Sequence, residues 1–433
     1  MTKNKSDRKI SVPVLARVEG EGALDISIKQ NKIENLQLRI FESPRLFEKL
    51  LEGRLYTEVP DIVSRICGIC PVAYQMSAVH AFEDLFDIDP GPWVRDMRRV
   101  YYCGEWIESH SLHIHLLAAP DFLGYDSAPA MAKAYPQELR RGLKLQALGN
   151  DLIKLFGARS VNPVGAKVGG FTRAPGMEEI DSLLDKLHAA LPDAKALINW
   201  TDALKVPKLD QQFTSVSISH PQEYPMNEGN LISSQGLHIP VDQFEQHFEE
   251  KHVAYSTALH CTLSGQPYLV GPLARINLNY DKLHPEVKQA IEKTRIQFPG
   301  QNVYHSIVAR AAEIFYALIE AIRLLQNYYV PRSPYINVTP KKGIAYSCTE
   351  APRGSLWHQY EVNEHGVVQK ARIVPPTSQN QARIEEDLRS TLEHYGLDAP
   401  EEKLRLRAEQ VIRNYDPCIS CATHFLNLSV TRQ

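Results

Sequence analysis

The sequence predicts an α-rich α+β protein, a large helical bundle with antiparallel β elements at its margin. Several long stretches repeat apolar residues at helical spacing, whereas the alternation typical of a β-strand is confined to short segments. The chain has 433 residues, of which 43% are hydrophobic and 23% charged, the composition of an ordinary globular protein. We therefore expect one domain over residues 1–433 with a substantial core.

The first predicted element is an N-terminal β hairpin within residues 10–45. Apolar and polar residues alternate over 24–28 and again over 36–40, with a polar turn at 30–32 between them. A period of two residues with a turn in the middle indicates two strands that share one buried face.

Most of the remaining chain is predicted to be helical. Residues 303–330 are apolar on more than one face, which places this helix in the middle of the bundle. Residues 205–280 mix short β-like runs with prolines and predict a mixed insertion, and 360–376 predict a second β segment that turns at 364–366. The other predicted helices cover residues 45–53, 73–86, 93–119, 137–157 and 401–415.

Charge and composition exclude several classes of protein. The net charge is −3 and no long basic run occurs, so we expect no nucleic-acid partner. No uninterrupted apolar run of ~18 residues is present, so we expect no membrane span. Residues 1–15 lack the apolar core of a secretory signal. Seven cysteines, an odd number, then indicate a reducing compartment, and we expect a cytoplasmic protein.

Two C-x-x-C pairs carry the strongest chemical signal. Cys67 and Cys70 lie in RICGIC, and Cys418 and Cys421 lie in DPCISCATH. Two such turns make a four-sulfur site that selects Zn, Fe–S, Cu(I) or Ni over hard cations. Zinc ribbons place their pairs only ~15–20 residues apart, and neither pair is the C-x-x-C-H of a c-type haem. A shared metal site is therefore expected; zinc is the commonest metal, and two separate redox motifs are the alternative.

The residues around these cysteines resemble the large subunit of nickel–iron hydrogenases. The resemblance is carried by R-I-C-G-I-C, D-P-C-x-x-C-x-x-H, ARVEGEG at 16–22 and EAPRG at 350–354, and it runs from about residue 10 to the C-terminus. ESHSLH at 108–113 is similar to the cytoplasmic branch that couples hydrogen to NAD(P) or to sulfur reduction. The fold of that family, a mainly helical bundle with marginal β structure, agrees with the predicted elements.

The resemblance implies reversible heterolytic cleavage of H2 at a Ni–Fe(CO)(CN)2 centre. In this family pattern Cys67 and Cys418 are terminal nickel ligands, and Cys70 and Cys421 bridge nickel to iron. Four thiolates would supply the electron density that the metal pair needs.

The resemblance also assigns the pocket around the diatomic ligands. Ala351, Arg353, Pro376 and Thr377 would line it, and Arg353 and Thr377 would donate to the cyanides. Arg353 keeps its proton under ordinary conditions, so we expect electrostatic and positioning work from it, with a role as base in H2 cleavage as the alternative. Asp416 would hold its guanidinium by a charge-assisted hydrogen bond.

Two glutamates receive roles from the same resemblance. Glu19 would relay protons away from a terminal thiolate; on the residues alone it would be a surface acid in a polar loop. Glu48 would bind Mg²⁺ (or Fe²⁺) together with the His424 imidazole and the Ile373 backbone carbonyl, with waters completing the octahedron. On the residues alone, Glu48 would lie on a solvated helix face.

The chain departs from the family pattern at two places. Tyr74 stands where many members carry His, and Ser109 stands where respiratory members often carry Asp. His110, His113 and His115 fall on two faces of a helix, so we expect them in the core or at an interface and not as ligands.

Partner subunits are implied by what the sequence lacks. No G-x-G-x-x-G follows a predicted strand, and Cys103, Cys261 and Cys348 stand alone. Electrons would therefore leave through an iron–sulfur small subunit, with flavin and NAD(P) on further diaphorase subunits. Two alternatives are a non-catalytic four-cysteine zinc scaffold and a complex I-like quinone-module subunit, whose relatives have lost the cysteines.

The end of the chain carries a last expectation. In this family a maturation protease cuts after the histidine of the D-P-C-x-x-C-x-x-H motif. The cut would follow His424 and remove residues 425–433.

Overall fold

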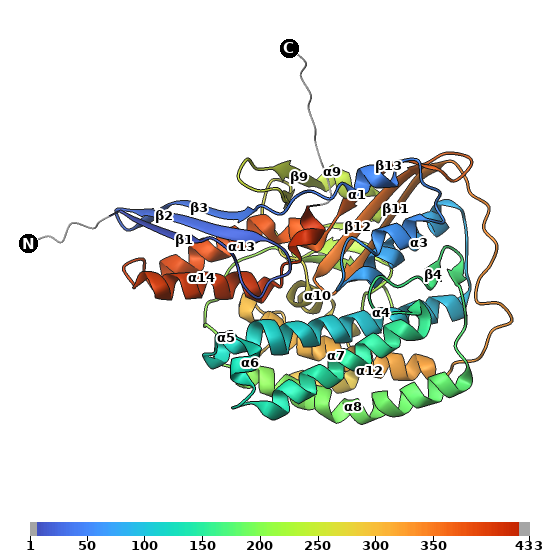
Figure 1. The fold of residues 1–433 in the computed structure, drawn as a ribbon, viewed down its shortest axis with the longest axis horizontal. Helices are drawn as coiled ribbons and strands as arrows, with labels where there is room; N and C mark the ends of the chain where they lie inside the picture. The colour runs from blue at the N-terminus through green and yellow to red at the C-terminus, as the bar shows by residue number, and fades with distance from the viewer. Residues whose placement is uncertain (1–6, 424–433) are drawn as a thin grey trace, which may run out of the picture.

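The structure of the protein is a computed structural model that describes residues 7–423. It confirms the predicted α-rich fold with small antiparallel sheets (Figure 1). The longer helices are α3 (Pro71–Leu85), α4 (Pro92–Leu112), α7 (Pro136–Gly157), α8 (Met177–Ala203), α12 (Ser306–Leu325), α13 (Pro376–Tyr395) and α14 (Glu401–Tyr415). The shorter ones are α1 (Phe47–Leu51), α2 (Val59–Val63), α5 (Ala119–Leu123), α6 (Ala128–Met131), α9 (Phe244–His247), α10 (Pro272–Asn279) and α11 (Pro285–Ile291).

The strands form several small sheets, all with antiparallel pairing. The two larger sheets are β1 (Arg8–Val12), β2 (Gly22–Lys29) and β3 (Lys32–Ile40), and β11 (Gly343–Ala351), β12 (Gly354–Val362) and β13 (Val368–Val374). The smaller ones are β4 (Ala166–Lys167) with β5 (Gly170–Phe171), β6 (Val216–Ser219) with β7 (Asn230–Ser233) and β8 (His238–Ile239), and β9 (Phe248–His252) with β10 (Leu259–Leu263).

Four long helices form the bundle. α4 packs against α7 and α12, and α12 packs against α8, as Figure 1 shows along one side of the molecule. Helices α4 and α7 approach closely because Gly104 faces Gly149: a Cβ on Gly149 would lie 2.5 Å from the Gly104 carbonyl oxygen. The predicted central helix, α12, is buried over nearly its whole length.

The N-terminal sheet has a core of its own. The predicted hairpin is present as β2 and β3, and its turn residues Gln30 and Asn31 have positive φ of 49° and 61°. The apolar face of this sheet packs against α13 and α14, the second of which covers the predicted residues 401–415. The sheet thereby carries the chain that follows β1, including Glu19, to the C-terminal end of α14.

The helix predicted over 93–119 is interrupted. α4 ends at Leu112, a π-helical turn covers His113–Ala118, and α5 follows. The wider turn rotates the side chains relative to regular helical spacing, and both His113 and His115 are buried.

Among the described helices, none is long and apolar enough to cross a membrane. The assignment of residues 1–433 to one domain, with a mixed insertion over 205–280, stays a prediction. Residues 205–280 hold β6–β10 with short helices.

Candidate metal centre

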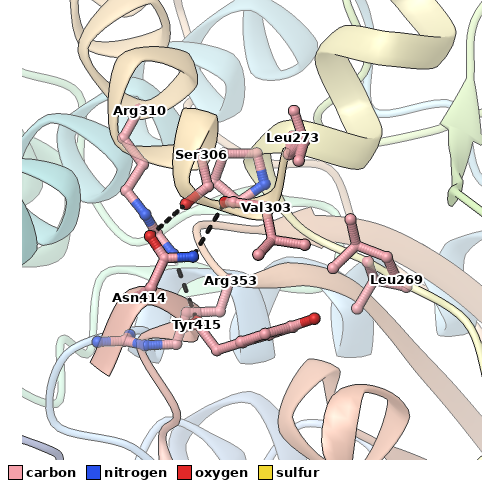
Figure 2. Close-up of a pocket in the computed structure, with 10 residues that line it drawn as sticks. Leu269, Leu273, Val303, Ser306, Arg310, Arg353, Asn414 and Tyr415 are labelled. Carbon is pink, nitrogen blue, oxygen red and sulfur yellow. Dashed lines mark hydrogen bonds between the residues drawn. The ribbon is translucent and has the colours of Figure 1, made fainter. Parts of the chain in front are cut away.

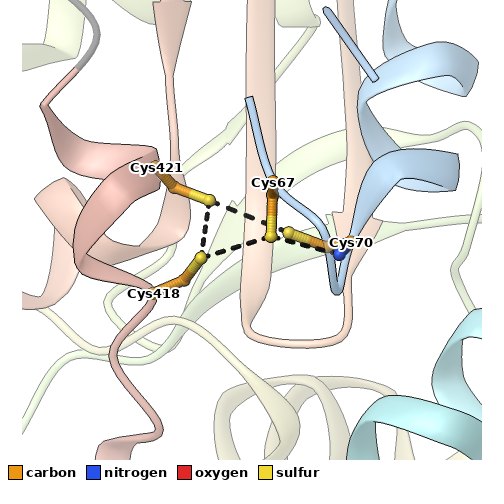
Figure 3. A group of neighbouring side chains, drawn as sticks. All are labelled: Cys67, Cys70, Cys418 and Cys421. Atoms are coloured by element: carbon orange, nitrogen blue, oxygen red, sulfur yellow. Dashed lines mark hydrogen bonds between the residues drawn. The ribbon is translucent and has the colours of Figure 1, made fainter. Parts of the chain in front are cut away.

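The two C-x-x-C pairs meet at one buried site although 351 residues separate them (Figure 3). Cys67 Sγ lies 3.3 Å from Cys418 Sγ, and Cys70 Sγ lies 3.8 Å from Cys421 Sγ. The sulfurs of Cys418 and Cys421 are 2.8 Å apart. None of these four described cysteines forms a disulfide, and each is only 1–4% exposed. Four unbridged sulfurs at this spacing fit the donor set of a soft-metal site.

The first pair lies in the turn between α2 and α3. Cys70 is the residue before the first turn of α3, and Cys67 Sγ accepts hydrogen bonds from the backbone N–H groups of Ile69 (3.3 Å) and Cys70 (3.2 Å). The Glu105 carboxylate of α4 accepts from the Val72 N–H at 2.6 Å and so holds the N-terminus of α3. The turn is thus held by hydrogen bonds to the Cys67 sulfur and by the bond between Glu105 and the start of α3.

The second pair follows the end of α14. Asp416 leaves the helix with a positive φ of 57°, a conformation that Asp tolerates better than most residues, and this turns Cys418 inward. The Thr377 hydroxyl, in the first turn of α13, accepts from the Cys418 N–H at 3.0 Å. Its own proton remains available to a group at the site.

Glu19, in the segment between β1 and β2, lies against the loop that carries the second pair. Its backbone forms a bridge with Cys418, and its carbonyl accepts from the Ile419 N–H at 3.0 Å. Its half-buried carboxylate accepts from the Ser420 N–H at 3.0 Å. Gly20 is required beside it, because a Cβ there would lie 2.6 Å from the Ile419 Cβ and the φ is +88°.

Arg45 connects the two cysteine loops and was not predicted as a site residue. Its guanidinium donates to the carbonyl of Ile66, the residue before Cys67, at 2.6 Å, and to the carbonyl of Ser420, the residue before Cys421. No sequence pattern marks such a residue, because its partners are backbone atoms.

Arg353 approaches the site from the opposite, buried side. It lies at the corner between β11 and β12, where its Nε donates to the Asp416 carbonyl at 2.7 Å and its Nη2 to the Asp416 carboxylate at 3.0 Å. Its Nη1 lies 3.4 Å from the Ser109 hydroxyl. Burial alone would lower the pKa of Arg353, but Asp416 and the cysteine thiolates outweigh burial and raise the pKa well above its ordinary value. The guanidinium therefore stays charged.

The electrostatics of the cysteines favour a bound cation. Burial raises the pKa of Cys70, Cys418 and Cys421. Burial acts the same way on Cys67, but hydrogen bonds from the neighbouring sulfurs outweigh it and lower its pKa. Four thiolates at this depth need more positive charge than Arg353 supplies, and a metal ion provides it.

The other predicted site residues lie on three different elements. Ala351 ends β11, Pro376 begins α13, and both are buried. Glu48 lies apart from the sulfurs in α1, and its carboxylate accepts from the Ile373 N–H at 2.8 Å. His424 lies outside the described residues.

Tyr74 lies one turn after Cys70 with its hydroxyl buried. Within residues 7–423 this hydroxyl has no hydrogen-bond partner, and its ring centre is 5.7 Å from that of His358. Burial, and then the charge on Cys421, raise the pKa of Tyr74 well above its ordinary value, so the hydroxyl keeps its proton.

His110 and His113 of ESHSLH, and His115 just after it, are all buried. His110 Nε2 is 2.9 Å from the Glu313 carboxylate, His113 Nε2 is 2.8 Å from the Arg413 carbonyl, and His115 Nδ1 is bonded to a carbonyl in its own helix. Each makes a hydrogen bond within the protein core.

Four buried cysteines that converge from the two ends of an α-rich chain define a metalloprotein. The family model described as nickel-dependent hydrogenase matches residues 45–151 and 159–424. The chain belongs to this family and is a large, catalytic subunit of the nickel–iron type, with the four cysteines as its metal site.

Known relatives match over nearly the whole chain. Sulfhydrogenase 1 subunit alpha of Pyrococcus furiosus is 35% identical, and the match covers 97% of this chain and 98% of the relative. NAD-reducing hydrogenase HoxS subunit beta of Cupriavidus necator is 26% identical over 97% of this chain and 95% of its own length. A crystal structure of an NAD⁺-reducing NiFe hydrogenase in the H2-reduced state has the same fold, with a TM-score of 0.89, 24% identity, and coverage of 96% and 99%.

Replacing Cys421 by Ser should abolish nickel retention and activity, because a neutral hydroxyl does not bridge two soft metals as a thiolate does. Metal analysis of the purified complex measures this. Cys103→Ala in α4 is the control, because Cys103 is buried away from the site, and it should keep its nickel. A fully active Cys421→Ser variant would contradict the assignment.

Replacing Arg45 by Met should weaken nickel retention about 10- to 100-fold, the usual cost of losing a residue that orients metal ligands. Nickel remaining after a timed chelator challenge measures the effect. Arg65→Met is the matched control, because Arg65 adjoins the same loop but is exposed, and its guanidinium donates to the Asp61 carbonyl instead of to the cysteine loops. Equal nickel loss in the two variants would show that Arg45 does not hold the loops.

Proposed function

We propose that this chain is the H2-cleaving subunit of a cytoplasmic hydrogenase that passes electrons through an iron–sulfur small subunit to NAD(P) or another soluble acceptor. The observation that carries the proposal is the convergence of two C-x-x-C motifs from opposite ends of the chain on one buried site. The names of its relatives, a sulfhydrogenase and an NAD-reducing hydrogenase, support the choice of acceptor.

The four cysteines fit a nickel–iron pair. Cys67 and Cys418 would be terminal nickel ligands, and Cys70 and Cys421 would bridge to an iron carrying CO and cyanide. All four sulfurs lie close enough to share one metal pair, and the division into terminal and bridging ligands comes from the family pattern. When bound, the metal pair supplies the electrophile that polarises H2 and takes up its electrons.

Arg353 and Thr377 would orient the diatomic ligands. The Thr377 hydroxyl accepts from the Cys418 N–H, which leaves its proton to donate toward a cyanide. Arg353 is fixed by Asp416, and its raised pKa supports electrostatic and positioning work over a role as base. Ala351 and Pro376 would form walls of the same pocket.

Glu19 would receive the proton and move it outward. Its carboxylate is half-buried and hydrogen-bonded to the loop between Cys418 and Cys421, so it lies between the sulfurs and the surface. A carboxylate in this place can exchange protons with a thiolate and with solvent.

A second cation, Mg²⁺ or Fe²⁺, would bind near Glu48. Glu48 and Ile373 already lie together, 2.8 Å from carboxylate oxygen to amide nitrogen. The Ile373 carbonyl and His424, outside the described residues, would complete the protein ligands.

Electrons would leave through other subunits. The described part of the chain holds no second group of cysteines close enough to bind a cluster. An iron–sulfur small subunit is therefore the proposed acceptor, with flavin and NAD(P) on diaphorase subunits.

H2 oxidation by the native complex tests the acceptor. NAD, NADP and a deazaflavin are supplied separately under H2, and we expect a nicotinamide to be reduced. Reduction of the deazaflavin alone would contradict the NAD(P) linkage and leave the hydrogenase assignment intact.

Glu19→Gln keeps the shape and the hydrogen bond to Ser420 but removes the titratable proton. H2-dependent dye reduction should fall about 100-fold or more, the usual size of a lost proton-transfer group, while nickel content stays normal. Glu21→Gln, at an exposed acid of the same loop, should have normal turnover. Normal turnover in Glu19→Gln would show that another group carries the proton.

Maturation is expected to remove residues 425–433, which lie outside the described residues. Cleavage after His424 would let the new terminus close over Cys418 and Cys421. Intact-mass measurement of active enzyme checks this, and an active, nickel-loaded subunit that still carries residues 425–433 would contradict it.

A further inference from the structure

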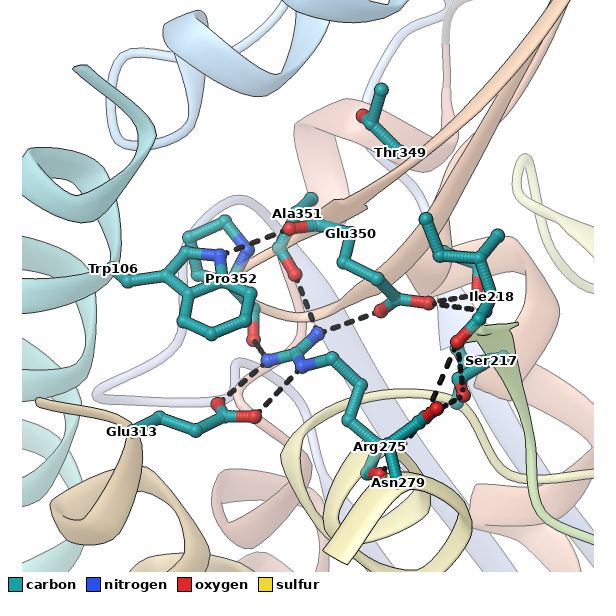
Figure 4. A network of polar contacts seen from close by, with 12 residues as sticks. Trp106, Ser217, Ile218, Arg275, Asn279, Glu313, Thr349, Glu350, Ala351 and Pro352 are labelled. Carbon is teal, nitrogen blue, oxygen red and sulfur yellow. Dashed lines mark hydrogen bonds and ion pairs between the residues drawn. The ribbon is translucent and has the colours of Figure 1, made fainter. Parts of the chain in front are cut away.

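Arg275, in α10, is completely buried and lies between two buried carboxylates (Figure 4). Its Nε and Nη2 donate to the two carboxylate oxygens of Glu313, both at 2.8 Å. Its Nη1 donates to the Glu350 carboxylate at 2.9 Å. The guanidinium also lies 4.5 Å from the centre of the Trp106 ring.

The remaining donors of Arg275 hold the corner that carries Arg353. Nη1 donates to the Ala351 carbonyl at 2.8 Å, and Nη2 donates to the Pro352 carbonyl at 2.9 Å. With the bonds to Glu313 and Glu350, all five guanidinium donors are used. No other side chain can reproduce this planar set, including Lys, which keeps the charge but not the fork.

A series of polar contacts leads from Glu313 to the Arg353 side chain. Glu313 also contacts His110 Nε2 at 2.9 Å, and His110 Nδ1 lies 3.5 Å from Arg310 Nη1. Burial lowers the pKa of His110 to about 4, so its ring is neutral, donating from Nε2 and accepting at Nδ1. Arg310 lies 3.3 Å from the Asp416 carboxylate, which binds Arg353.

These residues therefore form a closed ring of polar contacts. Starting from Arg353, it runs through Asp416, Arg310, His110, Glu313 and Arg275 and returns to Arg353 through the backbone of Ala351 and Pro352. A small cavity of about 20 Å³ is lined by Arg310 and Arg353, with room for little more than one water molecule (Figure 2).

Backbone packing restrains the same corner. A Cβ on Gly271, just before α10, would lie 2.9 Å from the Arg353 carbonyl oxygen, and its φ of +114° disfavours other residues. Gly354, after Arg353, has a φ of +135°, and a Cβ there would lie 2.9 Å from the Gly271 nitrogen. The start of α10 and the β11–β12 corner thus fit together only through two glycines.

We propose that Arg275 is a positioning residue for Arg353: it binds the backbone before Arg353 while Asp416 binds its side chain, so that the guanidinium faces the sulfur site in one orientation. This inference rests on the proposed role of Arg353 beside the metal ligands. Arg275 thereby contributes to the reaction although it does not itself contact the cysteines.

The test compares single and double variants of the intact complex. Arg353→Lys should lower kcat for H2 oxidation about 100-fold or more, and Arg275→Lys should lower it about 10- to 100-fold through misplacement. Both should keep normal nickel content and an unchanged KM for H2. The double variant should be no slower than Arg353→Lys, because Arg275 acts only through Arg353.

Infrared spectra supply a readout besides activity. The cyanide bands of Arg275→Lys should shift in the same direction as those of Arg353→Lys, because the donor to cyanide has moved. The matched control is Arg98→Lys, which disturbs a buried bidentate pair with Glu83 outside the ring and should leave the bands and kcat unchanged.

A double variant whose loss equals the product of the single losses would overturn the inference, as would unshifted cyanide bands in Arg275→Lys. If Arg275→Lys does not fold, Gly271→Ala displaces the same corner without removing a charge, and it should show the same band shift and kcat loss; normal bands there would also overturn it. Normal turnover in Arg353→Lys would instead contradict the proposed role of Arg353. The cyanide bands of Arg275→Lys would then still show whether the β11–β12 corner has moved.

Discussion

The metal centre depends on one constraint: two turns whose cysteines are 351 residues apart in sequence must meet, with Cys67 Sγ 3.3 Å from Cys418 Sγ. Each turn is held both by the helix next to it in the chain and by a helix distant in sequence. The first depends on α3 and on Glu105 of α4, and the second depends on the end of α14 and on α13. Metal binding at such a site is linked to folding, since the ligands come together only when these elements are in place.

The site has two sides with different physical character. On one side Glu19 and Arg45, from two different loops, bind the backbone around the second cysteine pair and remain partly open to solvent. On the other side Arg353 and Arg310 share the buried Asp416, whose pKa burial would raise but which these arginines lower. The first side is therefore partly open to solvent, while the second keeps fixed charges in fixed places.

The elements whose residues show a regular apolar–polar pattern within one stretch of sequence could be predicted. The hairpin of β2 and β3 has one apolar face, and α14 has a simple amphipathic pattern, so both were found with close boundaries. Helix α13 was not among the predicted helices, because its buried face is largely polar, with Gln379, Asn380 and Asp387 inside. Strand β1 was likewise absent from the prediction; it is short and is completed only by pairing with β2.

The residues of the candidate site likewise divide into those that the sequence predicts and those that it does not. The four cysteines could be predicted because their chemistry requires those side chains in that spacing. Arg45 and Arg275 could not, since each acts on backbone carbonyls of distant segments and leaves no pattern in the sequence. The π-helical turn at His113 could not be predicted either. It places His113 against the Arg413 carbonyl, a partner that becomes a neighbour only in the folded protein.

Metal analysis of the native, anaerobically purified complex tests the central claim most directly. The account predicts nickel in a one-to-one ratio with this chain, together with iron whose CO and cyanide ligands appear in the infrared spectrum. Zinc alone at the four cysteines, with no nickel and no such bands, would contradict it and would leave a structural four-sulfur site in place of a catalytic one.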